Sequence, residues 1–592
     1  MKWKRMNATR IRAIAAVLVA VFAALLPVCV MAPNVNLAIR TIALSAALLL
    51  FGRSLALISR PAPQRYGIKS PFASILIYAG IAIVIVCSSL VTATFVSQLA
   101  WIVQGLIALV MVVPACAVVG QAMFRLGLAI APNSLSQPTG QVPVRREWPR
   151  VAVVLAVRNE PVDVVVMTLR SALDSLYPTE QLRVVVVDNS SVNGDNIEKL
   201  EHAVAHACRG VQTNFVHRDG TEGFKPRNLD MAMEYVDAQY SLFLDADSTL
   251  APNSLAVAVD KMENDSDIGF VQMQTVSMNA SSSFFASAAA PYISLMRAGV
   301  DLLSQGGGFL FFYGHNAVWR TSAVRKCGPW EQYSGDQIMI GEDRTLSIAA
   351  HVKGIHGATI QERAGEWVPM SVGEYRTTYQ RWSKAFLQSF VRDMPGLLRS
   401  RNATVRVKID EGGRQMFIVS SILMPLLPVI AWTSSGSFVE TGYLAVFLFL
   451  QTMTAIAIYR RSPDDAPGGR FRAAVLGGYL LTAYTGWVAS TAVMQFVTRN
   501  QQGWKPTAKT TDSDAGLLTA LREHLGMVSF SVFTIVVTIV VGVSWASDGL
   551  AVSEAIDFVL CCTYAVSLLT FLMVFGRSTR LRKARVSLAV TI

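Results

Sequence analysis

The sequence is poor in charged residues. Asp, Glu, Lys and Arg make up 16% of its 592 residues, whereas 52% are hydrophobic, and a soluble domain has about 25% charged residues. Long apolar runs fill 11–130 and 415–577, while 145–400 has the composition of a soluble α/β domain. The chain is too long for one ordinary domain. We therefore expect two membrane sections flanking one soluble insert.

The sequence also lacks a cysteine framework. Its seven cysteines form no Cys-x-x-Cys pair and no His/Cys cluster, and most of them lie in apolar runs. This pattern argues against a disulfide framework and against structural zinc. The net charge of +12 could indicate nucleic acid, but most basic residues outside the insert lie at the ends of apolar segments. Because this is the pattern of cytoplasmic anchors, we expect no nucleic-acid partner.

The first half contains four candidate membrane spans, near 11–32, 37–59, 72–93 and 98–122. Each is close to the roughly 20 apolar residues that a spanning helix needs. The amino end and the loop 60–71 are basic, whereas the connections 33–36 and 94–97 have no Lys or Arg. This alternation predicts that the amino end, the loop and the insert are cytoplasmic. A cleaved signal peptide fits poorly, because further spans follow at once.

Apolar runs after the insert lie near 415–433, 439–458, 473–497, 525–546 and 556–576. Five spans would place the basic tail outside the cytoplasm. We therefore expect four true spans and one interfacial or re-entrant segment, for which the glycine-containing run 473–497 is the best candidate. The segment 372–399 alternates apolar and basic residues at helical spacing. It either lies flat on the membrane surface or is an ordinary amphipathic helix of the soluble domain.

These patterns divide the chain into four parts. We expect an N-terminal transmembrane section of about four helices (1–130), a cytoplasmic α/β domain (145–370), interfacial amphipathic helices (371–412) and a C-terminal transmembrane section (413–592). The expected location is the plasma (inner) membrane, with several spans. The sequence does not predict the oligomeric state.

The insert has the pattern of a parallel sheet with polar strand ends. The apolar runs 151–157, 183–191 and 240–249 are typical of strands buried on both faces, and a helix is expected over 161–176. The first run is followed by Arg158-Asn159-Glu160, the second reaches Asp188, and the third reaches Asp245-Ala246-Asp247. In open parallel sheets, ligands bind at the carboxyl ends of the strands. We therefore expect a binding site at this edge.

Asp245 and Asp247 are candidates for a metal site. Mg²⁺ and Mn²⁺ prefer oxygen ligands and often share them with substrate phosphates. An Asp-x-Asp pair also occurs by chance. A metal site is favoured here because the pair follows an apolar strand and is expected to lie level with Asp188.

Six motifs occur in a fixed order: Ala156 to Glu160, Val187 to Asn189, Gly223 to Asp230, Leu244 to Asp247, Gly341 to Arg344, and Gln380-Arg381-Trp382. This set resembles the inverting family 2 glycosyltransferases, above all the processive membrane synthases of hyaluronan, chitin, chitooligosaccharides and cellulose. The stretches 341–346 and 381–386 resemble hyaluronan synthases in particular, whereas 314–317 resembles osmoregulated glucan glucosyltransferases. The resemblance implies a GT-A fold, a doubly wound, Rossmann-like α/β domain, inserted between two α-helical transmembrane sections.

The resemblance also implies a donor site. Its residues would be Ala156, Glu160, Asp188, Lys225, Asp245 and Arg381, with Asp247 and Asp245 on the metal. Two alternatives stay open: Glu160 could support the start of the helix after Pro161, and Lys225 could be a solvated loop lysine. A lysine suits a phosphate as a point charge.

Asp343 is the candidate general base. Inverting transfer needs a group that takes the proton of the acceptor hydroxyl, and a neighbouring arginine or carboxylate, such as Arg344 or Glu342, can tune its pKa. The alternative is an amino-cap for a helix over 344–352.

The resemblance also implies that Trp382, Gln380 and Glu342 bind the acceptor. The family's first glutamine stands three residues before the arginine, where this chain has Thr378, so Gln380 could supply its hydrogen bonds. Trp504 resembles a gating residue that closes over the donor, with an ordinary basic surface loop as the alternative. Gln272, Gln274 and His315 could line the acceptor side or simply finish strands.

These residues predict an inverting hexosyltransferase that is metal-dependent and processive. It would use UDP-sugars and Mg²⁺ or Mn²⁺, and would extrude a β-linked polysaccharide through its own channel in the bilayer. UDP-GlcNAc with UDP-glucuronate would fit as the pair of donors, given the resemblance to hyaluronan synthases. The stretch 314–317 would also fit an enzyme whose product is a glucan. The alternatives are a non-processive transferase that adds one sugar to a lipid carrier and a transporter with a nucleotide-binding regulatory domain.

Overall fold

A computed structural model of the protein describes residues 142–190, 194–220, 222–305, 307–421, 438–462, 469–498, 521–548 and 552–575. The expected N-terminal transmembrane section and Trp504 lie outside these ranges, as do parts of the C-terminal section.

The strands are β1 (Val151–Val157), β2 (Leu182–Asp188), β3 (Gln212–His217), β4 (Tyr240–Leu244), β5 (Thr249–Leu250), β6 (Ile268–Ser277), β7 (Ala317–Arg320), β8 (Tyr333–Ser334), β9 (Gln337–Ile338) and β10 (His356–Glu366). The helices up to the last strand are α5 (Val162–Leu173), the 3₁₀ turn η2 (Thr179–Gln181), α6 (Gly194–Ala207), α7 (Phe224–Glu234), α8 (Ser254–Asn264), α9 (Phe284–Gln305), α10 (Thr321–Cys327) and α11 (Glu342–Val352). The later helices are α12 (Val372–Arg392), α13 (Met394–Arg399), α14 (Val405–Ser420), α16 (Phe438–Arg461), α17 (Gly469–Ala474), the π-helix η4 (Val475–Leu481), α18 (Thr482–Val497), α20 (Leu525–Asp548) and α21 (Val552–Phe575).

Eight of these strands form one mixed sheet in the order β3-β2-β1-β4-β7-β6-β10-β5. The first four are parallel, and three of them, β1, β2 and β4, lie on the predicted apolar runs, with β1 coinciding with its predicted strand. β3 was not predicted. β7 then pairs antiparallel with both β4 and β6. The sheet is therefore parallel on the side of the expected site and mixed beyond it, which the prediction of a doubly wound sheet did not include.

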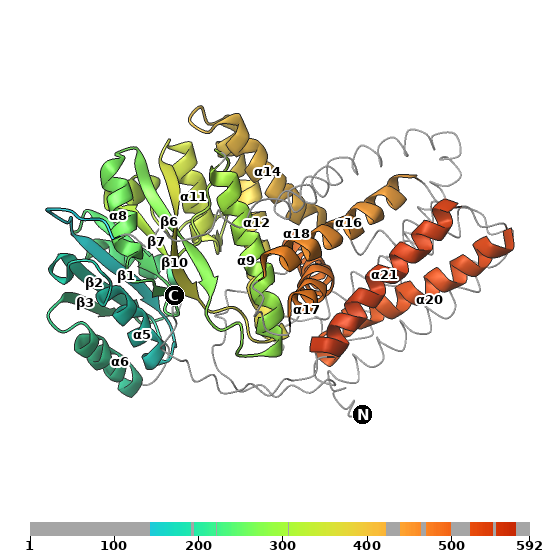
Figure 1. Cartoon of the computed structure of the whole chain (residues 1–592), viewed down its shortest axis with the longest axis horizontal. Coiled ribbons are helices and arrows are strands. Elements are labelled where there is room, and N and C mark those ends of the chain that lie inside the picture. The colour runs from blue at the N-terminus through green and yellow to red at the C-terminus, as the bar shows by residue number, and fades with distance from the viewer. Residues whose placement is uncertain are drawn as a thin grey trace, which may run out of the picture.

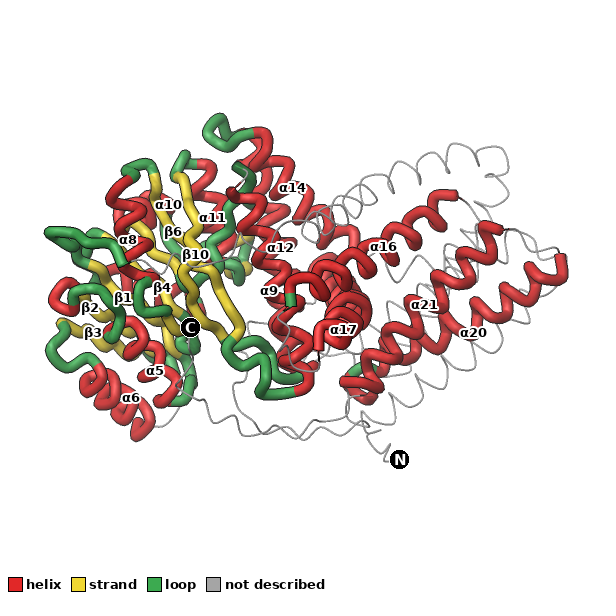
Figure 2. Tube along the Cα trace, viewed as in Figure 1, coloured by secondary structure: helices red, strands yellow, loops and turns green. Residues whose placement is uncertain are grey.

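Helices cover both faces of the sheet (Figures 1 and 2). α5, α6 and α8 bury their apolar stripes on one face, and α7, α10 and α11 bury theirs on the other. α5 contributes the fully buried Leu169, and burying such a side chain stabilises the fold by about 1.5–3 kcal/mol. These two layers fix the strand ends, and with them the loops that carry the polar motifs.

A helical part adjoins the sheet domain, and α9 and α12 lie between the two (Figure 1). α12 packs against α18, and η4 packs against α9 and α16. Gly478 allows this approach, because a Cβ there would lie 2.4 Å from the Cβ of Ala455. The predicted re-entrant segment 473–497 thus falls on a continuous helical run that is mostly buried, in which Gly477 and Gly478 allow close packing against α16.

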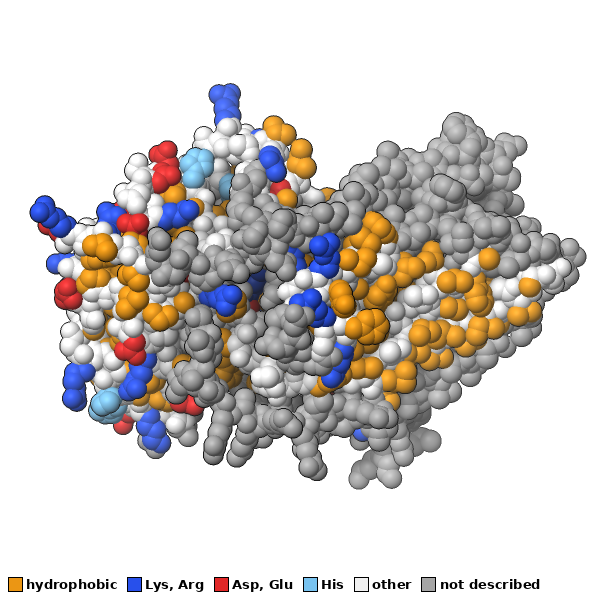
Figure 3. All heavy atoms as spheres, in the orientation of Figure 1, with side chains coloured by type: hydrophobic (Ala, Val, Ile, Leu, Met, Phe, Trp, Pro, Cys, Tyr) orange, Lys and Arg blue, Asp and Glu red, His pale blue; other side chains and the backbone are white. Residues whose placement is uncertain are grey.

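Two described helices hold stretches that are long and apolar enough to cross a membrane, Leu525–Val543 in α20 and Phe558–Phe575 in α21. Large apolar side chains on one stripe of α20 are exposed: Val532, Val536, Ile539 and Val543. Figure 3 shows apolar side chains over these helices and charged ones over the sheet domain. The two membrane sections stay a prediction.

Candidate active site

The ends of β1, β2 and β4 lie side by side. Val157 pairs with Asp188 across β1 and β2, and Leu155 pairs with Leu244 across β1 and β4. Because the three strands are parallel, the segments that follow them meet at one edge of the sheet. The predicted convergence of the three polar strand ends is therefore confirmed.

Asp188 has its carboxylate closed off from solvent, with 0% of the side chain exposed. One oxygen accepts hydrogen bonds from the Ser190 hydroxyl (2.5 Å) and amide (3.2 Å), and the other lies 2.8 Å from Nδ1 of His217. Ser190 in turn accepts a hydrogen bond from the amide of Asn159 (2.7 Å). Asp188 thus braces the loop after β1 and orients His217, whose ring is 23% exposed. The sequence analysis missed His217, although it ends a strand at the same edge.

Lys225 lies between two acidic motifs that are about a hundred residues apart in the sequence. Its Nζ is 2.7 Å from Oδ1 of Asp245, 3.5 Å from Oε1 of Glu342 and 3.4 Å from the carbonyl oxygen of Gly314. Burial lowers the pKa of Lys225, but Asp245 and Glu342 outweigh that effect and hold it above its usual value. The ammonium group is therefore charged, as contact with a diphosphate requires.

Asp343 lies in the first turn of α11, two residues after Gly341, which occupies the amino-cap position. Its Oδ1 accepts a hydrogen bond from the amide of Arg344 (2.7 Å). Burial and, next, the charge of Glu342 raise the pKa of Asp343, while Lys225 and Arg344 lower it, and the net pKa is about 6. A carboxylate with a pKa near neutrality is suited to general-base catalysis. The alternative of an amino-cap for a helix over 344–352 is wrong, because α11 begins at Glu342 and Gly341 occupies the amino-cap position. A negative charge in the first turn still suits the helix dipole.

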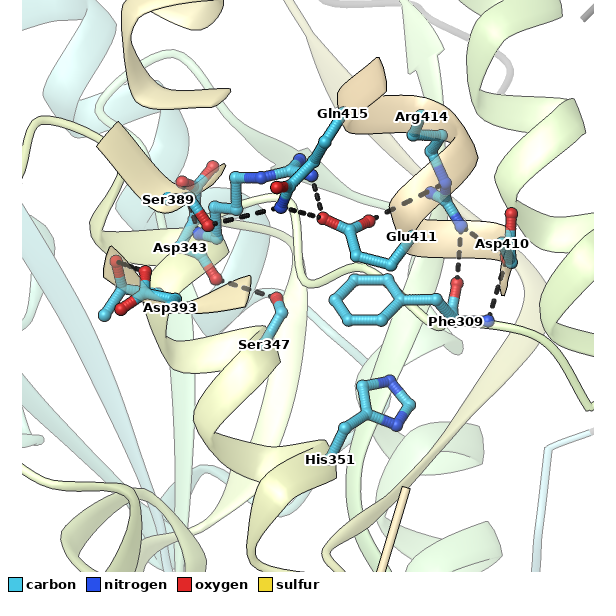
Figure 4. A network of polar contacts seen from close by, with 12 residues as sticks. Phe309, Asp343, Ser347, His351, Ser389, Asp393, Asp410, Glu411, Arg414 and Gln415 are labelled. Carbon is cyan, nitrogen blue, oxygen red and sulfur yellow. Dashed lines mark hydrogen bonds and ion pairs between the residues drawn. The ribbon is translucent and has the colours of Figure 1, made fainter. Parts of the chain in front are cut away.

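Arg344 is turned toward a residue that the sequence analysis missed. Its buried guanidinium forms an ion pair with Glu411 on α14 and lies 3.5 Å from the ring centre of Phe386. Figure 4 shows Glu411 in the polar network beside Asp343. The two partners are 67 residues apart, and local sequence gave no signal that they would meet.

α12 carries two of the three predicted acceptor residues, and the third, Glu342, begins α11. Trp382 is 36% exposed, and its ring lies 5.4 Å from that of Tyr379. The amide of Gln380 donates to Oγ1 of Thr491 on α18 (3.4 Å), and Thr378 is buried. Gln380 therefore contacts the helical part of the protein, while the Trp382 ring is accessible for stacking.

Gln272 supports the loop that faces Asp343. Its amide donates to the carbonyl oxygens of Asn316 (2.9 Å) and His315 (3.1 Å), and its Oε1 accepts from the amide of Tyr313 (3.0 Å). Nε2 of His315 lies 3.3 Å from Glu366. Both side chains thus hold interior structure in the described arrangement, which agrees with the simpler of the two sequence interpretations.

Asp245 and Asp247 follow β4 and are both partly exposed, whereas Ala246 between them is buried. Within the ranges that the structure describes, no three His, Cys, Asp or Glu side chains are grouped to hold a metal ion. Two carboxylates fit a hard cation that takes its remaining ligands from substrate phosphates and water. The donor set therefore suits a cation bound together with a nucleotide.

These features define an α/β domain with an acidic, lysine-containing site at the carboxyl edge of its sheet. Residues 152–328 match the family "Glycosyl transferase family 2", and residues 241–459 match "Glycosyl transferase family group 2". The chain therefore carries a family 2 glycosyltransferase domain, and the predicted family resemblance is confirmed.

Several curated proteins are similar to part of the chain. The probable glucomannan 4-beta-mannosyltransferase 7 of Oryza sativa subsp. japonica is 26% identical over 245 residues, which cover 40% of this chain and 41% of that protein. The hyaluronan synthase of Streptococcus pyogenes is 26% identical over 261 residues, 42% of this chain and 60% of that protein. The cellulose synthase catalytic subunit (UDP-forming) of Pseudomonas fluorescens (strain SBW25) is 29% identical over 126 residues, 21% of this chain and 16% of that protein. The chain thus spans less than two thirds of each relative.

Among solved structures, the mannosyltransferase PcManGT from Pyrobaculum calidifontis in complex with GDP-Man and Mn²⁺ is similar at 17% identity. The TM-score is 0.43, and the match covers 67% of this chain and 99% of that chain.

Proposed function

We propose that the protein is an inverting, metal-dependent glycosyltransferase that polymerises sugars from UDP-sugar donors into a β-linked polysaccharide. The observation that supports this most is the position of Lys225, held between Asp245 and Glu342 beside the candidate base Asp343. The ammonium group of Lys225 thus contacts both the motif expected to bind the donor diphosphate and the motif expected to bind the acceptor. The relatives are named as polysaccharide-forming transferases.

The donor would lie across the ends of β1, β2 and β4. Ala156, Glu160 and the Asp188 segment would hold the nucleoside, and the ammonium of Lys225 would contact the diphosphate. Asp247 and Asp245 would hold Mg²⁺ or Mn²⁺, which supplies positive charge for the departing diphosphate. Arg381 on α12 would add a second cationic contact.

Asp343 would carry out the proton transfer. Its carboxylate takes the proton of the acceptor hydroxyl while that oxygen forms a bond to the anomeric carbon. The bond from this carbon to the diphosphate breaks on the opposite side, so an α-linked donor gives a β-linkage. Trp382 would stack on the acceptor sugar, with Glu342 and Gln380 on the same side.

The helical part would place this reaction at a membrane. The exposed apolar stripe of α20 and the apolar length of α21 suit a lipid environment. We propose a protein of the plasma (inner) membrane with several spans, a cytoplasmic catalytic domain, interfacial helices over 371–412 and a channel for the product. Trp504 would close over the bound donor.

The test is nucleoside diphosphate release by the purified full-length protein in lipid. The donors are a panel of UDP- and GDP-sugars, singly and in pairs, and the GDP-sugars are included because some relatives are named mannosyltransferases. We expect release with at least one donor and a polymeric product. The variant Asp343→Asn should bind nucleotide but transfer no sugar. Release of nothing from any donor would contradict the proposal, and a product extended by a single sugar would contradict processivity.

A further inference from the structure

The buried ion pair between Arg344 and Glu411 joins the helix of the candidate base to a distant helix. Arg344 lies in the first turn of α11, which begins at Glu342, and Glu411 lies on α14. Their side chains are 2% and 0% exposed. The ring of Phe386 on α12 covers the guanidinium, so three helices meet at this pair.

Glu411 is itself held in place by its own helix and by α12. Nε2 of Gln415 donates to Oε1 of Glu411 (2.7 Å) and lies 3.5 Å from the hydroxyl of Ser389. Asp410 directly before Glu411 and Arg414 one turn after it pair with each other at 2.7 Å and bind the amide and the carbonyl oxygen of Phe309, both at 2.9 Å. Figure 4 shows these contacts as one network.

Hydrogen bonds to the backbone connect the same network to Asp343. The hydroxyl of Ser347 donates to the carbonyl oxygen of Asp343 (2.7 Å) and accepts from the amide of Phe312 (2.9 Å). The loop 309–314 is thereby fixed at Phe309 to α14 and at Phe312 to α11. Its last residue, Gly314, lies against the Asp343 side chain. The Asp343 carboxylate therefore lies where hydrogen bonds join the loop 309–314 to α11 and α14.

Stability alone does not explain a charge pair at this depth. Replacing a buried ion pair with apolar residues is often neutral or stabilising, whereas removing one partner leaves a buried charge uncompensated. Here the uncompensated charge would be Arg344, the residue next to Asp343. Its guanidinium would be drawn to the nearest free carboxylate, and an Asp343 paired with it would be a poorer base.

We propose that Arg344 and Glu411 are positioning residues, whose ion pair keeps the guanidinium away from Asp343 and fixes the turn that carries its carboxylate. The pair acts through Asp343 and need not touch either substrate. This inference rests on the proposed function, because it assigns Asp343 the role of base.

The test compares Glu411→Gln with Glu411→Asp in the full-length protein, by steady-state nucleoside diphosphate release. A reacting group misplaced by about 1 Å can cost a hundredfold in rate. We expect Glu411→Gln to lower kcat by about tenfold or more while the donor KM stays within about twofold. Glu411→Asp keeps the charge and should recover much of the lost kcat. A control is Asp260→Asn on α8, which removes the acid of the partly exposed ion pair with Arg145 (2.6 Å).

The outcomes separate this inference from the proposed function. If the wild type releases no nucleoside diphosphate from any donor, the proposed function fails. If the wild type is active and Glu411→Gln behaves like Asp260→Asn, only the positioning role fails. A parallel rise of donor KM would also overturn it, in favour of a general packing role. Should Glu411→Gln not fold, Gln415→Ala, which removes one hydrogen bond from Glu411, must lower kcat at constant KM, and an unchanged kcat overturns the inference.

Discussion

Gly314 lies directly against Asp343. A Cβ on Gly314 would be 3.2 Å from the Cβ of Asp343 and 3.4 Å from its Oδ2, and the backbone at Gly314 has a φ of +83°. The loop before β7 therefore approaches the candidate base so closely that a Cβ on Gly314 would require the Asp343 side chain to move by a few tenths of an ångström. Its carbonyl oxygen also lies 3.4 Å from Nζ of Lys225. One glycine thus faces both Asp343 and Lys225.

Gly314→Ala should therefore reduce activity more than it reduces stability. The methyl group must push on the Asp343 side chain, and we expect kcat to fall by about tenfold or more. The left-handed backbone adds a cost of about 1 kcal/mol in unfolding free energy. Gly307→Ala is a matched control, because its φ is +79° but nothing lies within 4 Å of its Cβ position. Equal losses of kcat in the two variants would show that backbone strain, not contact with Asp343, is responsible.

The pKa of Asp343 predicts the acid limb of the pH profile. The groups that act on it are Glu342, Lys225 and Arg344, and burial raises the pKa to about 6. A base must be deprotonated, so kcat should be constant above that pH and fall about tenfold per pH unit below it. The measurement is kcat at saturating donor between pH 5 and 8. A limb near the ordinary pKa of an exposed aspartate, about 4, would contradict this assignment.

The same raised pKa has a consequence for stability. A carboxyl whose pKa is higher in the folded protein than in the unfolded chain favours folding when protonated, so this contribution is lost as the pH rises from about 4 to about 6. Asp343→Asn removes the buried charge and should raise the thermal midpoint above pH 6. This gain should disappear below pH 4. Thermal unfolding of both proteins across this range is the measurement, and a lower midpoint at pH 7 would show that the carboxylate is stabilising.

The sheet edge could be predicted from the sequence because its signals are local. β1 is a continuous run of buried apolar residues, and parallel strands place their carboxyl ends together whatever the loops do. β7 was missed because it is only four residues long. Such a short segment carries no periodic pattern of its own, and only its pairing with β4 and β6 defines it.

The contacts inside the site could not be predicted in the same way. Asp188 was expected to face the ligand, but His217 and Ser190 enclose its carboxylate. Arg344 acts on the pKa of Asp343 from the next position, as expected, but its side chain is turned toward Glu411. Both outcomes depend on how separate elements pack, and the chemical type of a residue does not specify which neighbour it will meet.

Lys225→Met should weaken binding of the donor and disturb both acidic motifs. The substitution removes the cation between Asp245 and Glu342, so the two carboxylates lose their shared partner as well as the contact with the diphosphate. We expect kcat/KM to fall by about ten- to a hundredfold, which corresponds to about 1.4–2.8 kcal/mol. Nucleoside diphosphate binding, followed by calorimetry, should weaken in parallel. Lys261→Met on the exposed face of α8 removes the same charge elsewhere and should change neither quantity.

Removal of divalent cations should abolish transfer without unfolding the protein. Asp245 and Asp247 offer two carboxylates and no third acidic, His or Cys ligand among the described residues, so a cation should bind firmly only when a nucleotide supplies phosphate oxygens. A ligand that binds only the folded protein stabilises it by RT ln(1 + [L]/Kd), so a weakly bound ligand raises the thermal midpoint little and a tightly bound one raises it clearly. Mn²⁺ alone should therefore shift the midpoint little, Mn²⁺ with the nucleoside diphosphate should shift it clearly, and Asp247→Asn should remove the difference. A large shift with Mn²⁺ alone, retained in Asp247→Asn, would place the cation at another site.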